Sequence, residues 1–76
     1  MELEKLKAII ADVLNIDADI ITEDTTFVDD LGADSLDIFQ IIMGLEEEYD
    51  IELRNEIVEQ IQTVGDAAEA VRAAIQ

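Results

Sequence analysis

The sequence predicts an all-α fold: a small four-helix bundle with three longer helices, one short helix and a long loop between the first two helices. Half of the residues are hydrophobic, and apolar residues recur at spacings of three and four. No proline interrupts these segments, and no alternating strand pattern extends beyond a few residues. The 76 residues are expected to form one domain, residues 1–76, near the lower size limit for a chain that folds alone.

The first helix is predicted over residues 2–14, and Asn15 is expected to end it. Its apolar stripe contains Leu3, Leu6, Ile9, Ile10, Val13 and Leu14. Residues 16–34 show no sustained period and are predicted to form a long ordered loop. The side chains expected to pin this loop to the core are Ile20, Ile21, Phe27, Val28 and Leu31. A loop of this length more often serves a function than not.

A second helix is predicted over residues 35–49, and either Asp34 or Ser35 can cap its first turn. The broader apolar face, expected to pack in the core, contains Ile38, Ile41, Ile42, Leu45 and Tyr49. A narrower stripe on the opposite side contains Leu36, Phe39 and Met43, edged by Gln40 and bracketed by Glu46 and Glu47. Either the helix is buried on both sides, or the stripe is an exposed docking surface rimmed with carboxylates. The small size of the domain favours the second interpretation.

The last two helices are predicted from shorter signals. A short third helix is expected over residues 56–61. The fourth begins with a capping-box sequence, in which Thr63 is followed three residues later by Asp66. Its apolar stripe is predicted to comprise Ala67, Ala70, Val71, Ala74 and Ile75.

The formal net charge of −16, from 20 acidic and 4 basic residues, indicates the kind of partner. Nucleic acid and anionic membrane are not expected, because phosphate-rich surfaces bind basic proteins. No apolar run is long enough for membrane insertion, and MELEKLKAII lacks the apolar stretch of a signal peptide, so a cytoplasmic location is expected. The charge favours a protein partner with a basic surface. Glu46, Glu47 and Glu48 support this, because the helix macrodipole disfavours carboxylates at the C-terminal end.

Catalysis by this chain is not expected, because histidine is absent and no motif links Lys5 or Lys7 to Ser35. Ser35 has no neighbouring base, so a serine nucleophile is not supported and no catalytic residue is predicted. No metal site is predicted either. The acidic stretch DADIITED begins like a calcium loop but has Ile21 at the third ligand position and Thr22 at the required glycine position. Ser35 could be a helix cap and nothing more. Its place between a loop and a helix also suits a hydroxyl that accepts a group from another enzyme.

The sequence resembles the acyl carrier protein family over its whole length. The resemblance rests on LGADSLD, with Ser35 in the Asp-Ser-Leu position, on MGLEEEYDIEL and on QTVGDAAEAV. It implies that Ser35 carries 4′-phosphopantetheine, attached by a phosphopantetheinyl transferase that uses coenzyme A. It also implies that acyl groups are held as thioesters and shuttled between enzymes of fatty-acid synthesis by a monomeric carrier that is not itself an enzyme.

The resemblance implies partner contacts as well. Acyltransferases, ketosynthases and other acyl-processing enzymes would present basic docking patches to Asp34, Leu36, Phe39, Gln40, Met43, Glu46 and Glu47. The chain departs from the common fatty-acid type at Phe39, Gln40 and Arg54, where valine, glutamate and proline are usual. The short third helix carries fewer charges than usual, so Ile57 is either exposed or an added core contact. A dedicated carrier for a polyketide, lipid or peptide-like product is therefore the alternative. A more distant one is an acidic interaction module that is never modified.

Overall fold

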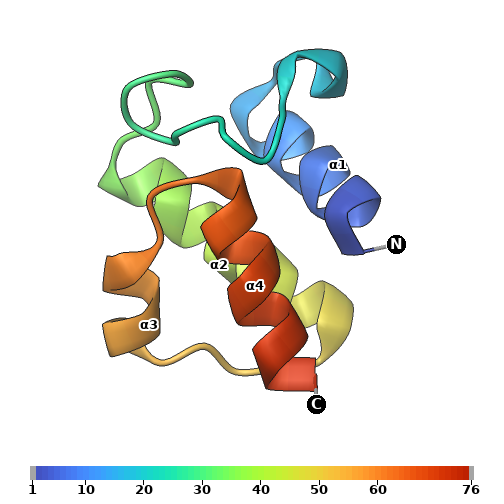
Figure 1. Ribbon diagram of the computed structural model, residues 1–76, viewed down its shortest axis with the longest axis vertical. Helices are drawn as coiled ribbons and strands as arrows, with labels where there is room; N and C mark the ends of the chain where they lie inside the picture. Colours follow the sequence, from blue (N-terminus) through green and yellow to red (C-terminus); the bar gives the residue numbers. More distant parts are fainter. Residues whose placement is uncertain (1, 76) are drawn as a thin grey trace.

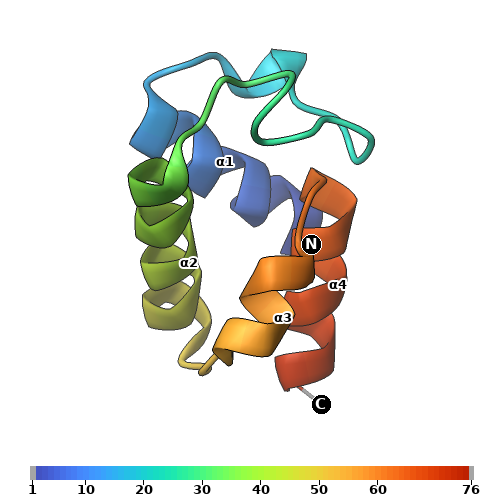
Figure 2. The same cartoon turned by 90° about the vertical axis from the view of Figure 1, so that its left-hand side faces the viewer.

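Four α-helices make up the fold in the computed structural model, which describes residues 2–75, and they confirm the predicted all-α architecture. In chain order the elements are α1 (Glu2–Leu14), a 3-10 turn η1 (Ala18–Ile20), α2 (Ser35–Tyr49), α3 (Asn55–Gln60) and α4 (Val64–Ile75). The long loop between α1 and α2 crosses one end of the bundle (Figure 1). The short α3 lies between α2 and α4 towards the other end (Figure 2).

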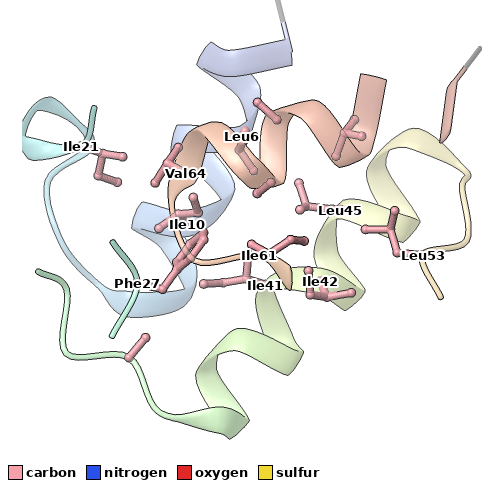
Figure 3. Close-up of a cluster of buried hydrophobic side chains, with 14 residues drawn as sticks. Leu6, Ile10, Ile21, Phe27, Ile41, Ile42, Leu45, Leu53, Ile61 and Val64 are labelled. Carbon is pink, nitrogen blue, oxygen red and sulfur yellow. The ribbon is translucent and has the colours of Figure 1, made fainter. Parts of the chain in front are cut away.

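An aliphatic core fills the space between α1, α2 and α4 (Figure 3). Each of these helices contributes two of the largest fully buried side chains, which are Leu6, Ile10, Ile41, Leu45, Val64 and Val71. Ile21 and Phe27 add buried side chains from the long loop. Burying one such side chain contributes about 1.5–3 kcal/mol. Because no disulfide is possible, this packing must carry most of the stability.

A residue with a left-handed backbone conformation follows each of the first two helices. Asn15 has a φ of 57°, and the N–H of Ile16 donates to the carbonyl of Ala11 at 3.0 Å, which confirms Asn15 as the terminator of α1. Asp50 has a φ of 54° after α2, and the N–H of Ile51 donates to the carbonyl of Glu46 at 3.1 Å. A positive-φ residue and one backbone hydrogen bond therefore end both helices, and neither residue is glycine.

The predicted capping box at the start of α4 is confirmed. The Thr63 hydroxyl accepts from the N–H of Asp66 at 3.1 Å. The Asp66 carboxylate accepts from the N–H groups of Gln62 at 3.1 Å and Thr63 at 3.2 Å. These backbone donors hold the pKa of Asp66 below its ordinary value, with a smaller contribution from the Thr63 hydroxyl.

The long loop is ordered, as predicted, because backbone hydrogen bonds fasten it to the start of α4. The N–H of Phe27 donates to the carbonyl of Gln62 at 3.0 Å, and the N–H of Val64 donates to the carbonyl of Thr25 at 2.9 Å. Gly65 adds a third bond, to the carbonyl of Glu23 at 2.9 Å. A side chain at Gly65 would lie 3.1 Å from that carbonyl oxygen, so the close approach favours glycine.

Two of the five side chains expected to pin the loop do not do so. Ile20 is 60% exposed and Val28 is 61% exposed. Ile20 precedes the buried Ile21, and Val28 follows the buried Phe27. In each pair of adjacent residues, only one side chain is buried in the core. The turn η1, which the sequence did not predict, ends at Ile20 and contains no buried residue.

Helix limits and the face of α4 also required correction. α3 begins and ends one residue earlier than predicted, so that Ile61 is buried just beyond its end. In α4 the predicted stripe is wrong at Ala74 and Ile75, which are exposed, while Val64 and Ala68 are buried. The last turn of α4 lies at the end of the bundle opposite the long loop (Figure 2), and the helical period continues there although the side chains are exposed.

Candidate functional site

Ser35 is the first residue of α2, and its side chain is exposed where the long loop meets the helix. Gly32, with a φ of 66°, turns the chain towards the helix. Ala33 is then buried, and its N–H donates to the carbonyl of Phe27 at 2.9 Å. Ala33 thus anchors the backbone two residues before Ser35.

Asp34, rather than Ser35, caps α2. The Asp34 carboxylate accepts from the N–H of Asp37 at 2.9 Å, and the Asp37 carboxylate accepts from the N–H of Asp34 at 3.3 Å. The role of Asp37 was not predicted. The sequence signal was present, because acidic residues three apart at a helix start repeat the spacing of Thr63 and Asp66. The sequence allowed Ser35 to be only a helix cap, but in the structure Asp34 fills that role and Ser35 does not.

The Ser35 hydroxyl differs from every other aliphatic hydroxyl in the chain. Ser35 is the one serine in the sequence, and the threonines are Thr22, Thr25, Thr26 and Thr63. The hydroxyls of Thr22 and Thr25 lie 3.1 Å apart, and Thr25 also accepts from the N–H of Thr22. Thr26 and Thr63 accept from backbone N–H groups. Among the serine and threonine hydroxyls of residues 2–75, Ser35 is the one without such a local bond, so it can react without disrupting the fold.

The narrow apolar stripe of α2 lies on the surface, which confirms its predicted exposure. Leu36, Phe39 and Met43, hereafter the docking stripe, are 63%, 59% and 49% exposed. Gln40 beside them is exposed too. The opposite face is buried at Ile41, Ile42 and Leu45 and partly buried at Ile38 and Tyr49, as predicted. A contiguous exposed apolar stripe on so small a domain is typical of an interaction surface.

The three glutamates at the end of α2 have different surroundings. Glu47 is exposed. Glu48 pairs with Lys5 of α1 at 3.2 Å, an exposed ion pair that contributes little to stability. Glu46 is partly buried, and its Oε2 accepts from the N–H of Leu53 at 2.8 Å. Sequence reasoning missed both contacts, because each partner comes from outside the helix.

A cavity of about 350 Å³ opens beside the first turns of α2. It lies between the helix, the long loop and the segment after α3, and is lined by Thr26, Phe27, Val28, Asp29, Ile38, Ile61 and Gln62. Ile38 follows Ser35 by three residues, so the two lie on the same side of the helix. An apolar space is therefore within one helical turn of the exposed hydroxyl.

Two further properties hold for residues 2–75. They contain no group of three or more acidic side chains that converge to hold a metal ion. None of their helices is long and apolar enough to cross a membrane.

Comparison with known proteins identifies the class to which this fold and site belong. Residues 4–71 match the family model described as a phosphopantetheine attachment site. An acyl carrier protein from Clostridium acetobutylicum is 53% identical over 73 residues, covering 96% of this chain and 95% of that protein. One from Clostridium perfringens is 54% identical over 68 residues, covering 90% of each. The chain is thus a phosphopantetheine-bearing carrier domain, and it belongs to the acyl carrier protein family.

Solved structures agree with this assignment. A chain from Mycobacterium tuberculosis, assigned as an acyl carrier protein, superposes with a TM-score of 0.91 at 40% identity, covering 96% of this chain and 97% of the other. The acyl carrier protein of Enterococcus faecalis gives a TM-score of 0.80 at 34% identity, covering 96% and 92%.

Proposed function

We propose that Ser35 is the residue that bears 4′-phosphopantetheine, and that this one domain, over residues 1–76, carries acyl groups between separate enzymes. The observation that supports the proposal is the exposed and locally unbonded Ser35 hydroxyl at the first position of α2. The serine needs no base of its own in this role, because the transferase that modifies it supplies the proton acceptor.

The residues around Ser35 suit such a group. The phosphodiester would sit at the N-terminus of α2, where the helix dipole favours negative charge. When bound, the group supplies the thiol that holds an acyl chain as a thioester, which a chain without cysteine cannot supply. Asp34 and Asp37 keep the start of the helix fixed, so the backbone that presents Ser35 is held in place. Phe27, Ile38 and Ile61 line an apolar space that can shelter part of an acyl chain.

Fatty-acid synthesis is the pathway that we assign to this carrier, with the named Clostridium relatives as support. The carrier acts in the cytoplasm as a monomer and leaves catalysis to its partners, such as acyltransferases and ketosynthases. A dedicated carrier is the second candidate. In its favour, a chain from a structure titled "The ishigamide ketosynthase/chain length factor" gives a TM-score of 0.76 at 29% identity.

Modification in vitro tests the assignment. Incubation of the purified protein with coenzyme A and a phosphopantetheinyl transferase should add one phosphopantetheine group per chain, measured by intact mass. Peptide mapping should place that group on the segment containing Ser35. A protein that stays unmodified while a control carrier is fully converted would instead be the acidic interaction module.

Glu47→Lys should slow association with the transferase by about fivefold at low salt, corresponding to roughly 1 kcal/mol for a charge contact in water. Because rim charges act mainly on association, high salt should remove most of the difference. Stopped-flow binding at two salt concentrations measures this. Glu23→Lys is the matched control, because Glu23 is an exposed glutamate on the long loop rather than on α2. Equal association rates for both variants would exclude Glu47 from the docking surface.

A further inference from the structure

Glu46 holds the linker between α2 and α3, residues 50–54, at two points. Its main-chain carbonyl accepts from the N–H of Ile51 at 3.1 Å as the helix ends. Its side-chain Oε2 accepts from the N–H of Leu53 at 2.8 Å, a short bond of the charge-assisted kind. Leu53 is only 8% exposed and belongs to the core cluster. The carboxylate thus ties the end of α2 to the residue that anchors the linker.

α3, which follows this linker, has few restraints of its own. It is six residues long, and none of its side chains is fully buried. Arg54 at its N-cap makes no side-chain capping bond. Cavities of about 240 and 210 Å³ lie between α3 and α4, both lined by Ile57, Ala70 and Ala73. Ile57 is therefore exposed at the edge of these spaces rather than an added core contact. With so little packing, the position of α3 depends strongly on its linkers.

We propose that Glu46 is a positioning residue for α3: its carboxylate holds the linker at Leu53, and a partner cation that pairs with that carboxylate loosens this hold. Docking on α2 and opening of the apolar interior beside α3 are then coupled through one side chain. This inference rests on the proposed function, because it assumes that a basic enzyme docks on α2. It also gives Glu46 and Glu47 different roles, although they are adjacent in the sequence.

The coupling follows from what a single carboxylate can bind. Glu46 is only partly buried, so a lysine or arginine of a partner at the end of the docking stripe can reach its second carboxylate oxygen, Oε1. Such a cation competes with the neutral N–H of Leu53 for the carboxylate and, as the stronger charged partner, weakens or displaces that bond. Glu47 is exposed and Glu48 pairs with Lys5, so neither holds the linker. Of these three glutamates, Glu46 is therefore the one that links the surface that partners meet to the segment that leads into α3.

Amide hydrogen exchange of the unmodified protein tests whether the Glu46 carboxylate restrains Leu53 and α3. In Glu46→Ala, exchange at Leu53 and through α3 should be about tenfold faster, the factor equivalent to 1.4 kcal/mol. Glu47→Ala removes the same charge from the neighbouring residue and should leave exchange unchanged. Glu46→Gln retains a side-chain carbonyl acceptor and should restore slow exchange. Unchanged exchange at Leu53 in Glu46→Ala would overturn the proposal, as would equal acceleration in α1 and α4.

The release step needs a partner, and the transferase without coenzyme A serves as the probe. At saturating transferase, exchange at Leu53 should accelerate in the wild type but not in Glu46→Gln, which has no carboxylate to pair with a cation. Leu53 exchange that the transferase does not accelerate in the wild type would overturn the coupling. Failure of the transferase to modify the wild type in the presence of coenzyme A would refute the carrier function instead, and the exchange data would still decide whether Glu46 holds α3.

Discussion

Ser35→Ala is expected to abolish modification by coenzyme A and a phosphopantetheinyl transferase, with no mass increase under conditions that fully convert the wild type. The loss should be complete because Ser35 is the only serine and every threonine hydroxyl is engaged in a local hydrogen bond. The fold should be retained, because the side chain is exposed and takes no part in the capping box. Stability should change by no more than about 0.5 kcal/mol, as for most surface substitutions.

Asp34→Ala is the matched variant, because it alters the adjacent residue. It should lower stability but still allow modification, the reverse of what Ser35→Ala should do. It leaves the serine in place but removes the cap that bonds the N–H of Asp37, which should cost about 1 kcal/mol of stability. It should still accept the group, although more slowly if the transferase contacts Asp34. Chemical denaturation and intact mass on the same samples separate the two effects. Continued modification of Ser35→Ala would show that another side chain is the attachment site.

The fold could be predicted well where periodicity and caps act locally. The apolar spacing of α1 and α2 located both helices, and Thr63 with Asp66 located the start of α4. These signals succeed because a helix places residues three and four apart on one face, whatever the rest of the chain does. The two faces of α2 could be separated for the same reason, so the docking stripe was correctly predicted to be exposed.

Prediction failed where burial depends on a distant segment. Ile20 and Ile21 are identical side chains in adjacent positions, yet only Ile21 is buried, because the contact with the core is set by how the loop lies on the bundle. Ala74 and Ile75 keep the helical period of α4 but are exposed, because no neighbouring segment packs tightly enough against them to bury them. Periodicity reports which face a residue occupies, whereas burial also requires an opposing surface.

The same limit applies to the candidate site: features set by neighbouring residues could be predicted, whereas contacts with distant residues could not. Ser35 could be singled out from its place at a loop–helix junction without knowledge of tertiary structure. The partner of Glu46, in contrast, is a backbone N–H seven residues away, and no sequence pattern marks such a contact. The three glutamates of α2 therefore looked equivalent in the sequence but differ in the folded protein. A charge run predicts the sign of a surface, but it does not indicate which of its members also hold the fold together.

Leu45→Ala and Met43→Ala should differ widely in stability although they lie two residues apart in α2. Leu45 is completely buried, and emptying such a site costs about 2–5 kcal/mol. For 76 residues the total free energy of unfolding is roughly 4–11 kcal/mol, so this variant should lose a large fraction of its stability. Met43 is half exposed, so Met43→Ala should cost less than about 1 kcal/mol. Urea denaturation followed by circular dichroism measures both.

This pair isolates packing because leucine and methionine have similar helix propensities and both are replaced by alanine in one helix. A stability difference between the variants must then come from what each side chain contacts. Transferase binding should show the reverse order: Met43→Ala should weaken it by removing part of the docking stripe, and folded Leu45→Ala should bind normally. A loss of several kcal/mol in Met43→Ala would mean that the stripe is part of the core. The acidic helix would then present only charge to its partners, and an apolar contact would have to come from elsewhere on the surface.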